Sequence, residues 1–132
     1  MKWTKDPKYT NVWVITKKFN GYQYNVIVMP EQTHKSIKYW ISVSSGKKRK
    51  EFEIFEGKEN KSLGGIRALF WIKEAMYDFP KFYKDKHSLF KLNSYICIGW
   101  SDSRRRDIYK RLEKEGFQFM MDEGNKILIK KL

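Results

Sequence analysis

The chain has 132 residues, of which 41% are hydrophobic and 17% aromatic. This composition is too apolar for a disordered chain, and the length fits one folded domain over residues 1–132. Lys and Arg number 28 against 15 Asp and Glu, which gives a formal net charge of +13. The excess predicts an anionic partner, either nucleic acid or an acidic protein surface. The alternative is a lysine-rich surface that only keeps an aromatic-rich domain in solution.

The cysteine, the two histidines and the apolar runs give no signal for a reactive site, a metal site or a membrane span. Cys97 is the one cysteine and lies within the apolar run YICIGW, so we expect a buried thiol rather than a disulfide or a nucleophile. His34 and His87 are far apart and have no partner at metal-ligand spacing, so no metal site is expected. The apolar runs are shorter than the roughly 18 residues of a membrane span, and MKWTKDPKYT lacks a signal core. We therefore expect a cytoplasmic protein without a membrane contact.

Strand signals dominate the first part of the chain. β-branched and aromatic residues are followed by Asn20-Gly21, a strong signal for a hairpin, and then by an alternating segment that ends at Pro30. Two further alternating segments follow, separated by a basic turn. The four predicted strands span residues 11–18, 22–29, 38–44 and 51–57.

The second part of the chain mixes helices and strands. Apolar residues at helical spacing follow Ser62 until Pro80, where we expect the helix to stop. Residues 95–100 form a continuous apolar strand, which indicates burial on both faces. A second helix is expected between a cap at Ser101 or Ser103 and Gly116.

Two strands, FQFMM and KILIKK, close the chain across the turn DEGN. The predicted fold class is α+β, with a mixed, mostly antiparallel sheet and the element order ββββ-α-β-α-ββ. The oligomeric state stays open, although an exposed strand over residues 126–131 would be able to pair with a second copy.

Arginines at the start of the second helix are the least expected feature. Arg104, Arg105 and Arg106 lie where the helix dipole disfavours cations by about 0.3–1 kcal/mol. Lys110 and Arg111 bring the number of cations to five in eight positions. A phosphate bound at the start of the helix would offset the unfavourable interaction between the arginines and the helix dipole. We therefore interpret these five residues as an anion-binding or nucleic-acid-binding cluster.

Two further basic clusters support this interpretation. Lys47, Lys48, Arg49 and Lys50 form a predicted hairpin tip that would straddle a phosphate backbone. In residues 81–86 lysines alternate with aromatic residues. The rings of that segment either stack on unpaired bases or fill the edge of the core.

A glycine-containing segment, Lys61-Ser62-Leu63-Gly64-Gly65-Ile66, precedes the first helix and is followed by Arg67. With the element order, this segment resembles the GNAT superfamily of acyl-CoA N-acyltransferases, without the helical segment that normally follows their first strand. The motif Arg/Gln-x-x-Gly-x-Gly/Ala of that family presents backbone amides to the pyrophosphate of coenzyme A. The resemblance implies that Lys61, Gly64, Gly65 and Arg67 hold acetyl-CoA. Ile66 departs from the motif, and a tight turn is an equal explanation of the glycines, in which case no cofactor is expected.

The segment from Arg111 to Phe117 is similar to the family's Tyr-Glu-Lys-Leu-Gly-Phe ending. Leu112 stands where that family often has a tyrosine that protonates the departing thiolate, and Tyr109 lies one helical turn earlier. Glu51, Glu53 and Glu56 follow one predicted strand, where they serve as a general base or simply solvate the sheet. No catalytic residue is assigned.

Three functions follow from these patterns. The first is a small basic, non-catalytic protein that engages nucleic acid, a nucleoprotein or an acidic partner through phosphate-type contacts. The second is a divergent GNAT-like N-acetyltransferase that uses acetyl-CoA. The third is an inhibitor of a host protein, of the small basic kind that bacteriophages encode.

Overall fold

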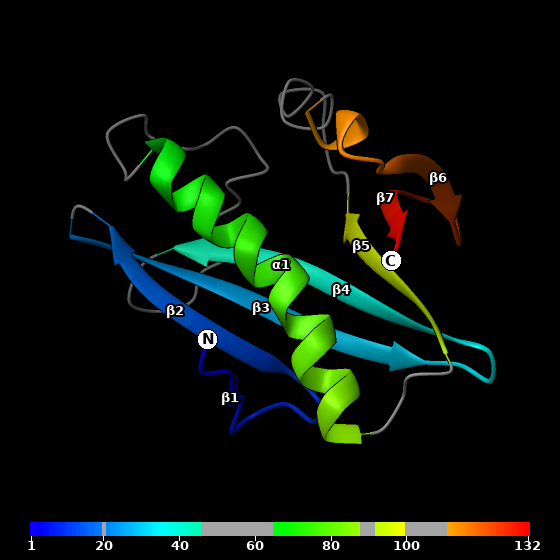
Figure 1. The fold of residues 1–132 in the computed structure, drawn as a ribbon, viewed down its shortest axis with the longest axis horizontal. Coiled ribbons are helices and arrows are strands. Elements are labelled where there is room, and N and C mark those ends of the chain that lie inside the picture. Colours follow the sequence, from blue (N-terminus) through cyan, green and yellow to red (C-terminus); the bar gives the residue numbers. More distant parts are fainter. Residues whose placement is uncertain (20, 46–64, 88–91, 100–110) are drawn as a thin grey trace.

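A mixed seven-stranded sheet, crossed on one face by a long helix, forms the centre of the fold (Figure 1). The computed structural model describes residues 1–19, 21–45, 65–87, 92–99 and 111–132. The elements are β1 (Thr4–Lys5), β2 (Trp13–Phe19), β3 (Tyr22–Gln32), β4 (Ser36–Ser45), α1 (Gly65–His87), β5 (Asn93–Gly99), β6 (Gln118–Asp122) and β7 (Asn125–Lys131). The strands lie side by side in the order β1-β2-β3-β4-β5-β7-β6. Among these strands β4 and β5 form the single parallel pair, so the predicted α+β class and mostly antiparallel sheet are confirmed.

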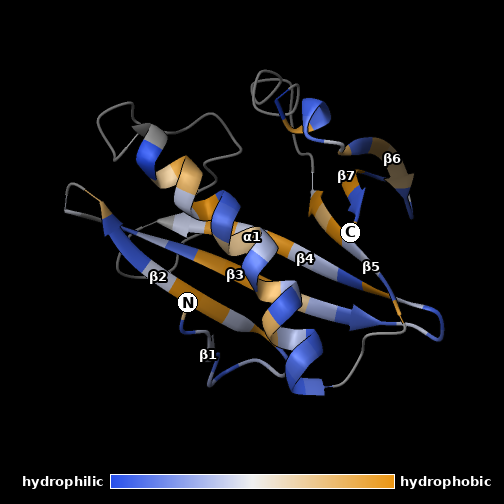
Figure 2. Cartoon of the chain, viewed as in Figure 1, coloured by the Kyte–Doolittle hydropathy of each residue, from blue (hydrophilic) through white to orange (hydrophobic). Residues whose placement is uncertain are grey.

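The predicted hairpin near the amino terminus is confirmed as β2 and β3. Gly21 has a φ of 81°, a conformation that glycine adopts without strain, and the two strands pair from Phe19–Tyr22 to Trp13–Val28. Along β2 the sequence changes from apolar WVI to polar TKK (Figure 2). The strand changes from buried to exposed at the same point. β3 continues past Pro30, where we expected the strand to end. The pairing of β3 with β2 stops at Val28, so no residue of β2 needs a hydrogen bond from the N–H that proline lacks.

The helix α1 runs through Pro80, so the prediction that Pro80 stops the helix is wrong. Pro80 itself is buried, and Phe79 and Tyr83 on either side of it are buried against the sheet. Tertiary packing therefore stabilises the turn that proline weakens by removing one backbone hydrogen bond.

The core lies between α1 and the facing sides of β2, β3, β4 and β5. Aromatic rings cluster around Phe79, whose ring centroid lies 4.8 Å from that of Trp3, 5.7 Å from that of Tyr39 and 5.6 Å from that of Tyr83. Trp3 Nε1 also donates a hydrogen bond of 2.8 Å to Asp78 Oδ2. The amino-terminal segment is thereby held against α1.

The carboxy-terminal hairpin corrects the prediction for the last strand. β7, which contains the predicted strand 126–131, lies between β5 and β6 and is not exposed at an edge. β5 pairs with β4 on one side and with β7 on the other, and Ile127 and Leu128 of β7 are buried. The edge strand on this side of the sheet is β6.

The second predicted helix is described only for residues 111–114, and its predicted end is confirmed. Gly116 has a φ of 101°, and Phe117 N donates a hydrogen bond of 3.1 Å to Leu112 O, which closes the helix end. An ion pair between Lys73 and Glu115 connects this turn to α1. The predicted strand 51–57 lies outside the described residues, and the short β1 was not predicted.

Candidate anion-binding end of the sheet

Two strand ends and one helix start lie at the same end of the sheet. β4 and β5 are parallel neighbours, paired from Ser36–Asn93 to Ile41–Ile98, so their carboxyl ends point the same way. α1 connects them and runs in the opposite direction, which brings its first turn to that end as well (Figure 1). Ligands of open α/β sheets bind outside the carboxyl ends of parallel strands, and a helix start favours an anion.

β4 and β5 separate before they end. Their pairing stops at Ile41 and Ile98, whereas β4 continues to Ser45 alongside β3. Gly99, the last residue of β5, pairs with Ile127 of β7 instead. The pairing of β4 with β5 therefore ends before either strand does.

Both strand ends lead into the basic segments identified from the sequence. Lys47 follows Ser45 of β4 by two residues, and Arg104 follows Gly99 of β5 by five. The sequence had suggested each cluster separately. The parallel pairing of β4 and β5 is what directs the chain into both clusters from one end of the sheet.

Three of the predicted site residues fall in the described part of the chain. Gly65 is the first residue of α1, Arg67 is exposed in the first turn, and Arg111 is exposed in the helical turn 111–114. The others lie outside the described residues, namely Lys47, Lys48, Arg49, Lys50, Lys61, Gly64, Arg104, Arg105, Arg106 and Lys110. Glu51, Glu53, Glu56 and Tyr109 also lie outside them.

The aromatic residues of the third basic segment fill the core edge. Residues 81–86 belong to α1, where Tyr83 is buried and the ring centroid of Phe82 lies 5.2 Å from that of Trp13. Lys86 Nζ lies 4.7 Å from the centroid of the Trp13 ring, a cation–π contact. The rings are therefore used for packing, and of the two interpretations of this segment the core interpretation holds.

Among the described residues, the strongly perturbed titratable groups are Tyr39 and Cys97, and burial is the main cause of both shifts. Burial raises the pKa of Tyr39, and the neighbouring Tyr83 raises it further, while Ser94 lowers it. Leu112, at the position where the resembled family often has a tyrosine, is 8% exposed and belongs to the core. His34 and His87 are exposed, and the described residues contain no group of side chains that could hold a metal ion.

Cys97 is buried, as predicted. The side chain is fully buried in β5, and burial raises the pKa of the thiol to about 12, with a smaller opposing effect from Lys38. A thiol with this pKa carries almost no thiolate near neutral pH. It supplies no nucleophile.

We predict that Cys97 resists alkylation in the folded protein. At about pH 8 the raised pKa lowers the thiolate fraction by roughly a thousandfold relative to a free cysteine, and burial blocks access as well. Mass spectrometry after treatment with iodoacetamide should find the native protein unmodified and the protein in guanidinium fully modified. Rapid modification without denaturant would show that β5 opens in the native state.

No protein family, curated protein or solved structure matches this chain. Within the described ranges, no helix combines the length and the apolar character needed to cross a membrane.

Proposed function

We propose that this protein binds nucleic acid through phosphate contacts at the end of the sheet where β4 and β5 stop and α1 begins. The observation that carries the proposal is the parallel β4–β5 pair. Beyond the carboxyl end of each strand, the sequence reaches a basic cluster within a few residues. The first turn of α1 adds backbone N–H groups and Arg67. Phosphate oxygens are the ligands that this combination of cations and amides attracts.

The charge of the whole molecule supports the same partner. The net charge of +13 on 132 residues creates a positive potential that accelerates encounter with a polyanion. Exposed lysines outside the basic clusters, among them Lys17 and Lys18 on β2, contribute to it. Such binding draws most of its free energy from the release of counterions and carries little sequence preference.

The test is the salt dependence of binding. Fluorescence anisotropy with labelled single-stranded and double-stranded DNA and RNA should give log K falling linearly with log salt. The expected slope is about −0.9 per phosphate contact on duplex DNA and about −0.7 on a single strand. Permuted sequences of one length should bind alike.

Labelled polyglutamate is the matched control, because it offers negative charge without phosphate. Equal affinity for polyglutamate and nucleic acid would replace the nucleic-acid assignment with an acidic protein partner. Weak binding at low salt, or a slope near zero, would refute the proposal.

A second candidate function is a GNAT-like N-acetyltransferase, favoured by one observation. α1 begins at Gly65, within the segment 61–66 that resembles the coenzyme A motif, and forms the crossover between two parallel strands. Calorimetry with acetyl-CoA tests this function, with the variant Gly64→Glu as the control that blocks approach to the backbone. Leucine at position 112 has no proton to donate, so binding without turnover is the outcome that fits the chain.

A further inference from the structure

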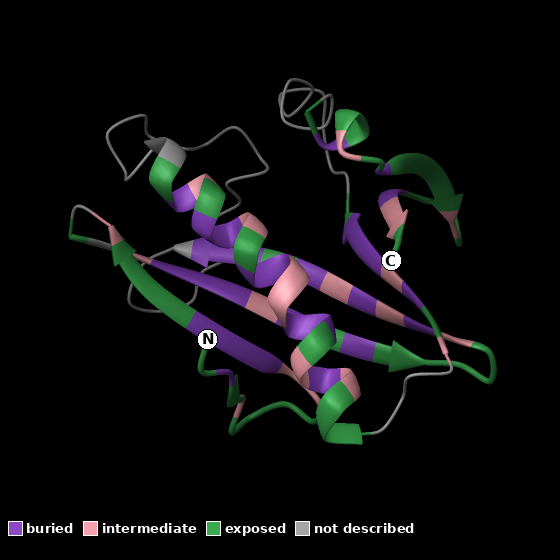
Figure 3. Ribbon diagram, in the orientation of Figure 1, coloured by how far each residue is buried: buried purple, intermediate pink, exposed green. Residues whose placement is uncertain are grey.

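The sheet has a second face, opposite α1. The residues of β4 that belong to the core beneath α1 are Ile37, Tyr39, Ile41 and Val43. Lys38, Trp40 and Ser42 alternate with them and therefore point to the opposite face. Figure 3 shows this alternation as buried and partly exposed residues along β4. Within the described residues, α1 and the helical turn 111–114 both pack on the core side, and no helix lies on the other side.

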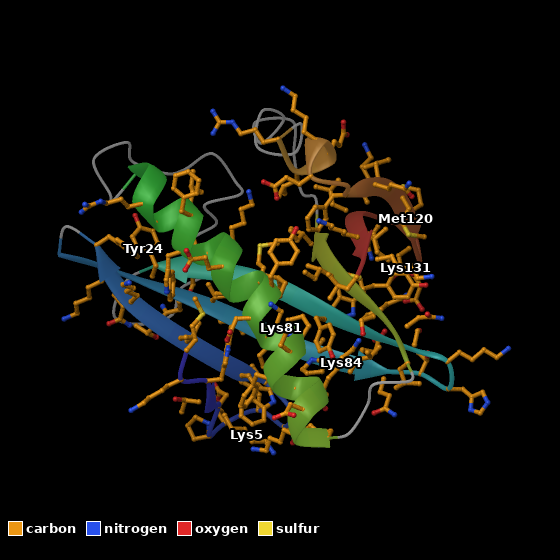
Figure 4. All side chains as sticks on the ribbon, viewed as in Figure 1. Lys5, Tyr24, Lys81, Lys84, Met120 and Lys131 are labelled. Carbon is orange, nitrogen blue, oxygen red and sulfur yellow. The ribbon has the colours of Figure 1, made fainter. Side chains whose placement is uncertain are left out.

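The first row of residues across this second face places a ring between two cations. Lys38 of β4 lies beside Tyr95 of β5, and Tyr95 lies beside Lys131 of β7. Tyr95 is partly exposed, and Lys131, labelled in Figure 4, is exposed. Burial raises the pKa of the Cys97 thiol and Lys38 lowers it, which places the Lys38 ammonium group near the same face. Glu31 of β3, opposite Lys38, adds one carboxylate at the end of the row.

The next row places Trp40 on an apolar surface. Trp40 pairs with Met29 of β3 on one side and with Cys97 of β5 on the other, and Cys97 pairs with Ile129 of β7. Met29 is 46% exposed, Trp40 and Ile129 are partly exposed, and Cys97 is buried between them. Trp40 and Tyr95 are diagonal neighbours on adjacent strands, which separates their positions by about 8 Å.

Trp40 and Tyr95 differ from the rings of the core. The described tryptophans Trp3, Trp13 and Trp71 are buried and contact other rings, whereas Trp40 is partly exposed. Within the described part of the chain, neither Trp40 nor Tyr95 contacts another aromatic ring or a cation. The exposed parts of these two rings are therefore available to a ligand.

We propose that this second face binds a single-stranded stretch of DNA or RNA, with bases stacked on Trp40 and Tyr95 and phosphates beside Lys38 and Lys131. The inference rests on the proposed function, because it takes nucleic acid as the ligand and adds a contact to the bases. Every base has a π-face, so aromatic rings bind bases with little sequence preference while lysines neutralise the backbone.

The chemistry of the face favours a single strand over other partners. A duplex keeps its bases stacked and paired, so only unpaired bases are able to stack on side chains. Two lysines beside Tyr95 and a net charge of +13 complement a polyanion rather than an apolar protein surface.

The second face leads to the proposed phosphate-binding end of the sheet. From Lys38 in the first row, β4 continues to Ser45 at its carboxyl end, a distance of about 23 Å along the strand. A stretch on the order of four nucleotides, the lower end of the range for single-strand-binding domains, spans such a distance. One strand is thus able to place bases on the rings and phosphates at the end of the sheet.

Anisotropy with labelled oligothymidine, oligouridine and a DNA duplex of the same length tests the proposal. Trp40→Leu and Tyr95→Leu each keep an apolar side chain but remove a ring. Each should lower the affinity for the single strands by roughly tenfold. The slope of log K against log salt should stay unchanged, because lost stacking alters no phosphate contact. The affinity for the duplex should also stay unchanged.

Tryptophan fluorescence provides a readout that a merely structural role of Trp40 would not move. A base stacked on Trp40 should quench its emission. Trp40→Phe keeps a ring for stacking, so this variant should bind the single strands with nearly the affinity of the unmodified protein but with a smaller quench. Phe70→Ala is the matched control, because Phe70 is 57% exposed on α1, on the other side of the sheet. Its affinity and quench should equal those of the unmodified protein.

Circular dichroism should show that all of these variants are folded. Unchanged single-strand affinity of both leucine variants would overturn the inference, and so would an equal loss of affinity for single strands and duplex. Equal weakening of polyglutamate binding by the leucine variants would assign the face to an acidic peptide instead.

The same titrations separate this inference from the proposed function. Duplex binding with a steep salt slope, together with leucine variants that bind single strands normally, would refute the inference alone. Single-strand binding that depends on Trp40 and Tyr95 but has a salt slope near zero would refute the proposed function alone.

Discussion

Replacing Phe79 with alanine should lower the free energy of unfolding by about 3–5 kcal/mol. The side chain has no exposed surface and contacts rings from three other parts of the chain. These are Trp3 before β1, Trp13 of β2 and Tyr39 of β4. Truncation would remove all of these contacts at once and leave a cavity between α1 and the sheet.

Denaturation by guanidinium, followed by circular dichroism, measures this change. Phe70→Ala is the control on the same helix, because Phe70 is 57% exposed, and its effect should stay within about 0.5 kcal/mol. A domain of this size has about 5–15 kcal/mol of total stability, so Phe79→Leu provides a milder variant if Phe79→Ala does not fold. Equal effects at Phe79 and Phe70 would contradict the aromatic core described for α1.

Local signals in the sequence predicted the local structure. Alternation and a glycine turn predicted β2 and β3, and helical spacing predicted α1, because these patterns depend on residues a few positions apart. Pro80 was misread for the same reason: the packing of Phe79 and Tyr83 that keeps the helix intact involves distant strands.

Strand order could not be predicted, because it depends on pairing between segments far apart in the sequence. The strand 126–131 looked like an edge strand, with lysine at both ends of ILI, yet β7 is interior and β6 forms the edge. The apolar run of β5 did indicate burial on both faces. A strand, a helix and a second apolar strand in succession are the pattern of a parallel crossover, and this signal would have identified the β4–α1–β5 unit.

The anionic partner inferred from the sequence stays a prediction, and the sequence did not indicate that the strands leading to two of the basic clusters end on the same side of the sheet. Net charge and the clusters of arginine and lysine indicated an anionic partner, and that expectation rests on composition alone. Their common origin at one end of the sheet follows from the register of β4 with β5, which no single segment encodes. The aromatic residues of 81–86 show the opposite case, since a pattern typical of stacking on bases belongs to the core.

The triple variant Arg104→Ala, Arg105→Ala and Arg106→Ala should weaken binding to duplex DNA by on the order of a hundredfold at low salt. Each phosphate contact releases about 0.9 counterion, so the slope of log K against log salt should become shallower by about 2.7. The fold should persist, because cations at the start of the helix predicted from the sequence would oppose its dipole rather than stabilise it. Anisotropy titrations over a salt series measure the affinity and the slope together.

The informative control removes the same charge near the carboxyl end of α1. Lys5, Lys81 and Lys84, labelled in Figure 4, lie towards the carboxyl end of that helix. Their replacement by alanine lowers the net charge by the same amount, so the long-range attraction of a polyanion falls equally in the two triple variants. If only the general charge matters, both variants lose affinity alike and the site at the ends of β4 and β5 is refuted. A loss confined to the arginine variant, with the shallower slope, is what direct phosphate contacts at that end of the sheet require.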